Sequence, residues 1–318
     1  LQVQDGTNLI TLNNSGITDL AGNSGTGTTN SPNYTVNTVL PTATIVVADT
    51  ALAVGETSLV TITFSEAVSG FNNADLSIAN GTLSTVISND GGLTWTATFT
   101  PSSNVDDSTN LITLDNTGVM GVSGNTGIGS TDSNNFAIDT QRPTATIVIA
   151  DSALSVGETS TVTVTFSEAV TGFTRADLSV SVGQLSNFIS SDGGVTWTGT
   201  LTPDSNISNT SNVIVLDNTG VADLAGNNGS GTTDSNAFAV DTQRPTAVIS
   251  MADTALSAGE STLVTFTFSE AVNGFSNDDL SVANGTLSDV TSIDGGITWT
   301  ALFTPTLQVQ DGTNLITL

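Results

Sequence analysis

The chain repeats itself every 102 residues, and this period limits the fold to a row of similar small domains. The segment PTATIVVADTALAVGETSLVTITFSEAV begins at Pro41, and close variants of it begin at Pro143 and Pro245. The twelve residues LQVQDGTNLITL stand at both 1–12 and 307–318, three periods apart. A fixed period of this kind is the signature of repeat proteins, in which each unit contacts mainly its neighbours.

The repeat starts divide the chain into four parts. Residues 41–142 and 143–244 are complete units, called unit one and unit two below. Residues 245–318 form unit three, which lacks its last strand, and residues 1–40 form a leading segment that corresponds to the last strands of a unit. Because the opening stretch returns at the end and residue 1 is not methionine, we expect an interior piece of a protein that continues in both directions.

Within each unit, apolar residues alternate with polar ones, which is typical of strands that turn one face toward a core. The Asp-Gly pair in NDGG, at 89–92, predicts a tight hairpin between two such strands. We expect two apolar rows to supply much of the core of unit one: Val60, Ile62 and Phe64 from LVTITFSE, and Leu93, Trp95, Ala97 and Phe99 from LTWTATF.

About seven short strands in a hundred residues predict an all-β, immunoglobulin-like sandwich, here without a disulfide because the chain has no cysteine. A unit of this size buries enough surface to fold by itself. We therefore expect tandem sandwiches arranged as an elongated array. For unit one the expected strands are 42–49, 58–66, 74–80, 82–87, 93–100, 110–115 and 134–139.

The charge balance excludes several classes of function. The chain has 30 acidic residues, three arginines, and no lysine or histidine, so its formal net charge is −27. Nucleic acids and anionic membranes are bound by clustered Lys and Arg, which this chain lacks. Its apolar runs are too short to insert into a bilayer. An excess of carboxylates fits a chain that stays soluble by self-repulsion or that holds cations.

Several recurring motifs resemble those of a known family. TFSEAV, GTLS, WTATFTP, DLAGN and VDTQRPTA are similar to the bacterial Ig-like repeats of giant surface adhesins, which include biofilm-associated and type I-secreted, calcium-dependent proteins. The resemblance implies an extracellular location at the bacterial surface, a role as a long extender, and junctions stiffened by Ca²⁺. It also implies two kinds of partner: neighbouring copies of the repeat, and other cells or surfaces reached by a tip outside this chain.

The predicted fold brings acidic residues of successive units together. In an Ig-like path, the last strand of one unit leads through VDTQRP into the next unit, whose loops lie beside the linker. Oxygen ligands without nitrogen or sulfur favour Ca²⁺ over transition metals. We therefore expect a calcium site at the junction of units one and two, formed by Asp139, Glu168, Asp177, Asp223 and Asn227.

The other two junctions carry different residues. After unit two, the equivalent ligands are Asp241, Glu270 and Asp279, and the counterpart of Asp19 and Asp223 lies beyond Leu318. Before unit one, Asn37 stands where the other linkers have aspartate, and Gly121 stands where the other loops have aspartate. Because both losses fall at one junction, we expect weak or no calcium binding there and a possible hinge.

The sequence is compatible with three kinds of function to different degrees. A structural extender fits units that repeat without a distinctive loop. A glycan- or protein-binding module would need one unit with divergent, aromatic-rich loops, and a polymeric surface filament would need residues 1–40 of one copy to complete unit three of another. An enzyme is not expected, because Asp106–Asp107, the one adjacent acidic pair in a distinctive loop, is not repeated.

Overall fold

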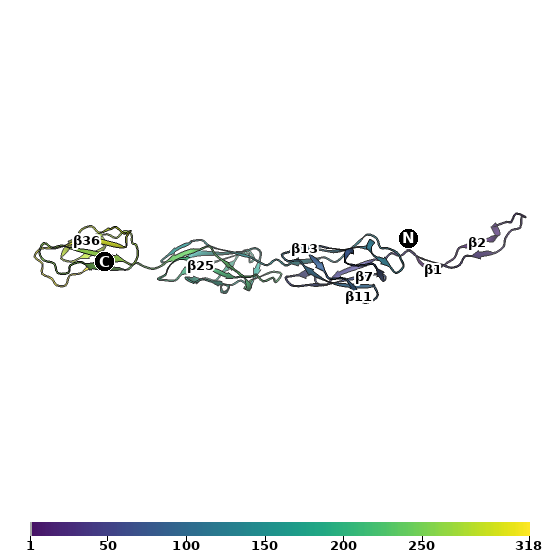
Figure 1. The fold of residues 1–318 in the computed structure, drawn as a ribbon, viewed down its shortest axis with the longest axis horizontal. Helices are drawn as coiled ribbons and strands as arrows, with labels where there is room; N and C mark the ends of the chain where they lie inside the picture. The colour runs from purple at the N-terminus through teal and green to yellow at the C-terminus, as the bar shows by residue number, and fades with distance from the viewer. Residues whose placement is uncertain (1) are drawn as a thin grey trace.

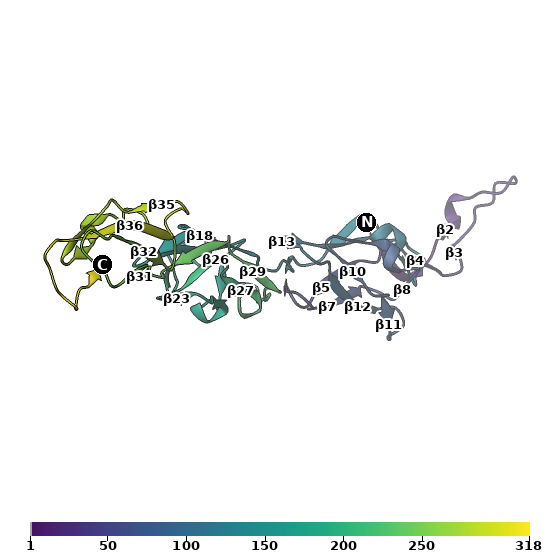
Figure 2. The same ribbon diagram turned by 60° about the vertical axis from the view of Figure 1, so that its left-hand side comes forward.

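A computed structural model describes residues 2–318. Units one, two and three follow one another along a single line, in chain order (Figure 1). The leading segment extends away from unit one as a long, narrow hairpin, and a second view shows the same arrangement (Figure 2). Each of the three units has a separate hydrophobic core. The elongated array expected from the sequence is therefore the observed architecture.

Unit one is a sandwich of two sheets. The first has the antiparallel order β10-β12-β7-β5, with β11 paired to β12. Its strands are β5 (Ala43–Val47), β7 (Ser58–Phe64), β10 (Gly81–Leu83), β11 (Ile87–Ser88) and β12 (Thr94–Pro101).

The second sheet of unit one is built from broken strands. Strand β14 lies between β9 and β16, and β17 lies between β13 and β6. All these pairs are antiparallel except β6 with β17, which is parallel. The strands are β6 (Ala51–Leu52), β9 (Leu76–Ile78), β13 (Asp106–Asn110), β14 (Ile112–Asp115), β16 (Ser130–Asp132) and β17 (Phe136–Asp139), with the short pair β8 (Val68–Ser69) and β15 (Met120–Gly121) and the 3-10 turns η2 (Asn73–Asp75) and η3 (Asn116–Gly118).

Unit two repeats this topology element by element. Its first sheet contains β18 (Ala145–Ile149), β20 (Ser160–Phe166), β23 (Gly183–Leu185), β24 (Ile189–Ser190) and β25 (Thr196–Pro203). Its remaining elements are β19 (Ala153–Ser155), β21 (Val170–Thr171), η4 (Arg175–Asp177), β22 (Leu178–Ser179), β26 (Ser208–Asn212), β27 (Val215–Asp217), η5 (Asn218–Gly220), β28 (Ala222–Asp223), β29 (Thr232–Asp234) and β30 (Phe238–Asp241).

Unit three and the leading segment contain parts of the same pattern. The leading segment consists of β1 (Gln4–Asn8), β2 (Thr11–Asn13), η1 (Asn14–Gly16), β3 (Thr28–Asn30) and β4 (Tyr34–Asn37). Unit three consists of β31 (Ala247–Met251), β32 (Thr262–Phe268), η6 (Asn277–Asp279), β33 (Ser281–Val282), β34 (Gly285–Leu287), β35 (Thr291–Ser292), β36 (Thr298–Pro305) and β37 (Ile316–Thr317).

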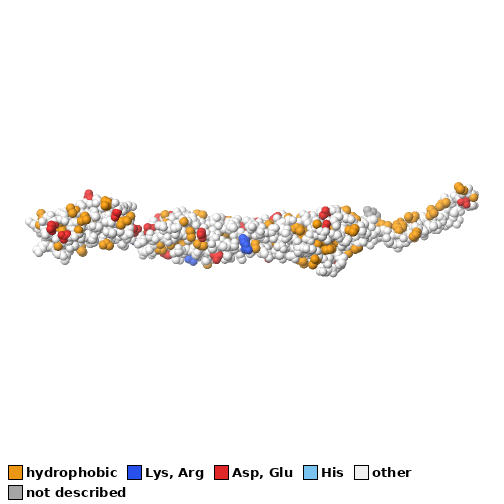
Figure 3. Space-filling model, viewed as in Figure 1, with side chains coloured by type: hydrophobic (Ala, Val, Ile, Leu, Met, Phe, Trp, Pro, Cys, Tyr) orange, Lys and Arg blue, Asp and Glu red, His pale blue; other side chains and the backbone are white. Residues whose placement is uncertain are grey.

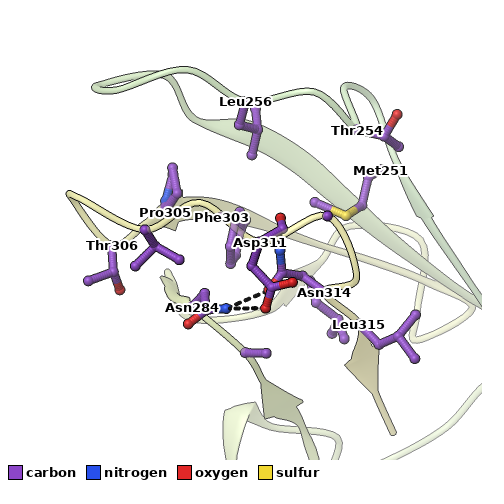
Figure 4. A pocket seen from close by; sticks show the side chains of 14 residues that line it. Met251, Thr254, Leu256, Asn284, Phe303, Pro305, Thr306, Asp311, Asn314 and Leu315 are labelled. Carbon is purple, nitrogen blue, oxygen red and sulfur yellow. Dashed lines mark hydrogen bonds between the residues drawn. The ribbon is translucent and has the colours of Figure 1, made fainter.

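Unit three holds a cavity of about 260 Å³ on the side where units one and two have their last strand. Met251, Leu256 and Phe303 line it, and the side-chain amide of Asn284 donates to Asp311 across it, at 3.0 Å (Figure 4). In unit two, the corresponding place is filled by β30, whose Phe238 is 2% exposed. The cavity therefore marks the place of that strand rather than a separate binding site.

The alternation in the sequence predicts the core correctly in most places. Val60, Ile62 and Phe64 are buried, and the ring of Trp95 packs edge-on against Phe71 while its Nε1 donates to the carbonyl of Gly92. The prediction for Leu93 is wrong, because this side chain is 40% exposed. It precedes β12 in the hairpin, where the strand alternation does not yet apply. Among the described residues, no helix has the length and apolar character needed to span a membrane.

Candidate metal centre between units one and two

Three acidic side chains meet where unit one joins unit two. Asp139 ends β17 of unit one, Glu168 follows β20 of unit two, and Asp223 ends β28 of unit two. One carboxylate oxygen from each lies within 4.8 Å of those of the other two. Asp223 is 2% exposed, and the other two are half-buried. The sequence prediction that these three acids converge agrees with this geometry.

Local hydrogen bonds position the acids, and Asp139 Oδ1 accepts from the N–H of Gln141 at 3.1 Å. The hydroxyl of Ser167 accepts from the backbone N–H of Thr144, which holds the end of β20, and thus Glu168, against the linker. The loop after Asp223 closes on itself, because the N–H of Asn227 donates to Asp223 Oδ1 at 2.8 Å. Gly226 makes this loop possible, since its φ of 92° lies in the left-handed region that glycine adopts readily. The acids are therefore held in place by the protein.

Burial and mutual repulsion make the charged state of the cluster unfavourable. Burial raises the pKa of Asp139 above its ordinary value, and the charge of Asp223 adds to the rise. Burial also raises the pKa of Glu168, with further contributions from the charges of Asp223 and Asp139. A cluster of this kind is stabilised either by protonation or by a bound cation.

A fourth acid lies beside the cluster, and the sequence analysis did not assign it to the junction. Asp106 is in β13, directly across from Asp139 in the antiparallel ladder. Its charge contributes to the raised pKa of both Asp139 and Glu168. The polar run NVDDSTN hides this strand in the sequence and makes Asp106 look like a loop residue. The antiparallel pairing of β13 with β17, the last strand of the unit, is the feature that places Asp106 beside Asp139.

Asn227 connects the two units through hydrogen bonds made by both the nitrogen and the oxygen of its side-chain amide. Its Nδ2 donates to the carbonyl of Asp139 at 2.9 Å and to Asp223 Oδ2 at 2.8 Å. Its Oδ1 accepts from the N–H of Val54, in unit one, at 2.6 Å. The linker residue Arg142 makes another contact across the junction, to the carbonyl of Asn228. The predicted ligand Asn227 therefore acts in this structure as a hydrogen-bond bridge.

Asp177 is not part of the cluster. Its Oδ2 accepts from the N–H of Thr174 at 2.7 Å, as the acidic member of a capping box that forms η4. In unit three, Asp279 has the same role in η6, where it accepts from the N–H of Ser276. The structure thus explains the recurrence of both acids by turn formation. Their predicted place beside the junction acids is not observed.

The chain matches one protein-family model, described as bacterial Ig-like domain, in four successive segments: residues 1–36, 37–138, 139–240 and 241–318. Together these segments cover the whole chain. The chain belongs to the bacterial Ig-like domain family.

Two solved structures of bacterial adhesins are also similar to these Ig-like units. FdeC, an adhesin of Escherichia coli, is 14% identical, with a TM-score of 0.31 over 86% of this chain and 95% of that chain. The adhesin InvE of Yersinia pseudotuberculosis is 15% identical, with a TM-score of 0.24 over 81% of this chain and 73% of that chain. Among the curated proteins compared with it, none matches the chain.

The junction between Ig-like units two and three contains two of the expected acids. Asp241 is exposed and accepts from the N–H of Gln243. Glu270 has one buried carboxylate oxygen, Oε1, that finds no hydrogen-bond partner among the described residues. Asp19, in the leading segment, accepts from the amide of Asn23 in its own loop, and this bond lowers its pKa. Among the described residues, the fold therefore brings neither Asp19 nor another acid equivalent to Asp223 to Asp241.

The junction before unit one keeps the bridge but lacks the acids. Asn125 occupies the position of Asn227, and its amide donates to the carbonyls of Asn37 and Val39. A Cβ added to Gly121 would lie 2.5 Å from Oε1 of Glu66, so the glutamate carboxylate occupies the space that the equivalent aspartate fills in unit two. Glu66 thus lies beside Gly121, and among the described residues of the linker Asn37 stands where the next junction has Asp139.

Proposed function

We propose that the chain is an extender segment of a bacterial surface adhesin and that Ca²⁺ stiffens the junction between units one and two. One observation carries this proposal: the clustered acids Asp139, Glu168 and Asp223 come from both units and meet where unit one joins unit two. A cation bound there would hold the two sandwiches at a fixed angle.

The donor set fits calcium. All three side chains offer carboxylate oxygens, and Ca²⁺ accepts six to eight oxygen ligands, including carbonyls and water. The chain has no cysteine or histidine, which zinc and copper prefer. Asp139 and Asp223 would hold the ion from opposite sides of the junction, and Glu168 would add a third carboxylate. Bound calcium would supply positive charge that offsets the repulsion among these three carboxylates.

The surface of the rod fits a spacer rather than a catalyst. Acidic side chains are scattered along the visible face, with few basic ones among them (Figure 3). We propose that the units bind each other end to end, and that attachment to another cell or surface, including a role in biofilms, belongs to a tip outside this chain. The location would be the extracellular face of the bacterium.

Small-angle scattering and thermal melts test the proposal. With calcium, we expect a narrow distribution of lengths and a raised melting temperature, and with a chelator a shorter mean length. If neither quantity responds to calcium, the stiffening proposal is wrong. If both respond and Asp223→Asn abolishes the response, the cluster is the site.

A further inference from the structure

The side chain of Asn227 contacts two strands of the preceding unit at the same end. Its Nδ2 donates to the carbonyl of Asp139, the last residue of β17. Its Oδ1 accepts from the N–H of Val54, two residues after the end of β6. Asn227 is 2% exposed, so these bonds are shielded from water. One residue of unit two thus joins the chain after β6 to the end of β17 in unit one.

Those two strands are the parallel pair of unit one. Ala51 lies opposite Ala137 and Leu52 lies opposite Ile138, and the N–H of Ala137 donates to the carbonyl of Thr50 at 2.8 Å. The chain enters unit one through β5 and β6 and leaves it through β17. Tension along the rod therefore pulls the two strands in opposite directions along their axes. Hydrogen bonds perpendicular to that pull must break together before the strands can slide.

We propose that Asn227 is a clip that locks this parallel pair, so that docking of unit two protects unit one against opening by tension. While the clip holds, a pull by unit two acts on both β17 and the segment after β6, in the same direction. The two strands then cannot slide past each other until the clip breaks. The inference concerns hydrogen bonds between protein groups, and it does not depend on the proposed calcium site.

The same turn in unit two provides a matched control. Val54 and Gly55 form the centre of a turn in which the N–H of Glu56 donates to the carbonyl of Ala53, and Gly55 has a φ of 84°. Val156 and Gly157 form the same turn, with a φ of 82° at the glycine. Val54 is half-buried, whereas Val156 is 44% exposed. Of the N–H groups of Val54 and Val156, only that of Val54 donates to a neighbouring unit among the described residues.

Proline at these positions separates the clip from the turn. Proline is favoured at the second position of a turn whose third residue is glycine with positive φ, so Val54→Pro and Val156→Pro should both fold. Val54→Pro removes the N–H that donates to Asn227 Oδ1, and so removes a bond between units. Val156→Pro removes no bond between units. Asn227→Ala is a second variant, which removes the bridge from the side of unit two.

Amide hydrogen exchange, read by mass spectrometry on the whole chain with a chelator present, tests the proposal. We expect peptides that cover 49–56 and 135–141 to exchange roughly fivefold to tenfold faster in Val54→Pro and in Asn227→Ala. Peptides 151–158 and 237–243 of unit two serve as internal controls and should not change. In Val156→Pro, the unit one peptides should exchange at the original rate.

Two results would overturn the clip. One is unchanged exchange in unit one for both Val54→Pro and Asn227→Ala, and the other is an equal effect of Val156→Pro on unit one. Constant-force pulling gives a second readout, in which one of the two complete units should unfold roughly tenfold faster in Asn227→Ala. If the calcium proposal fails but the exchange result holds, the clip stands alone. If calcium changes the length of the rod but exchange is unaffected, the clip is wrong and the metal site is not.

Discussion

The two junctions that flank unit one share a frame but differ in charge. Asn125 and Asn227 both donate to carbonyls of the linker that precedes their unit. Around Asn227, three carboxylates lie within 4.8 Å of one another, whereas around Asn125 one carboxylate fills the space beside a glycine. Hydrogen bonds from the asparagine are thus sufficient to place the linker. The acids at the second junction add a concentration of negative charge that the first junction lacks. The comparison separates a junction that has a cluster of carboxylates from one that lacks it, and under the calcium proposal only the first should respond to a cation.

The largest expected effect is the loss of calcium-dependent stability when an acid is removed. At a hundredfold excess of calcium over its Kd, a bound ion stabilises the folded state by about 2.7 kcal/mol. Asp223→Asn should abolish most of this gain, measured as the difference in melting temperature with calcium and with chelator. Asp234→Asn, an exposed change in the same unit, should keep the full difference. An equal loss in both variants would contradict a specific site.

Introducing acids at the junction before unit one, which lacks the carboxylate cluster, sharpens the comparison. Gly121→Asp should destabilise unit one by about 1–3 kcal/mol, because it buries a second carboxylate against Glu66. Adding Asn37→Asp should make this junction respond to calcium. Denaturant unfolding with calcium and with chelator measures both effects. A double variant that stays insensitive to calcium would show that acids alone do not make the site.

Asp139→Asn gives an effect whose sign depends on calcium. With chelator at neutral pH, the variant should be more stable than the parent chain by about 1 kcal/mol, because it removes one of several repelling charges. With calcium it should be less stable, because a ligand is lost. Melting curves in the two conditions decide, and the same order in both would contradict a shared ion.

The difference in stability between Asp139→Asn and the parent chain should depend on pH, because the pKa values of Asp139 and Glu168 are raised. Because these carboxyl pKa values are raised in the folded state, the folded chain still binds protons at a pH where the unfolded chain has released them. The stability that this proton binding contributes therefore falls as pH rises from the ordinary pKa values of 3.8 and 4.5 through the raised values. In chelator, the advantage of Asp139→Asn should therefore vanish on acidification. Asp192 behaves in the opposite way, because hydrogen bonds led by the N–H of Thr196 lower its pKa to about 2.

The smallest expected effect belongs to Asp106. Its side chain is exposed, so its repulsion of Asp139 is weakened by water. Asp106→Asn should change stability by less than about 1 kcal/mol and should weaken calcium binding only slightly. Calcium titration of the variant, followed by calorimetry, measures this. A loss as large as that of Asp223→Asn would instead make Asp106 a direct ligand.

The sequence by itself determined the repeat, the strand pattern and the residues that carry the cluster. These features are local or periodic: alternation places Val60 and Ile62 in a core, and a shift of 102 residues aligns the units. The Ig-like path then predicted that Asp139 approaches Glu168 and Asp223. Sequence reasoning succeeded there because all three lie at strand ends, where the topology alone sets their place.

Only the tertiary structure decided what each polar group does. Recurrence could not separate Asp177, which caps a turn, from Asp223, which faces the linker, because both kinds of residue recur between units, the first as Asp75 and Asp279 and the second as Asp19. Strand pairing across the unit placed Asp106 beside Asp139, and packing between units gave Asn227 its partner Val54, 173 residues away in the chain. Contacts of such separation depend on the register and docking of whole sheets, which no local pattern in the sequence records.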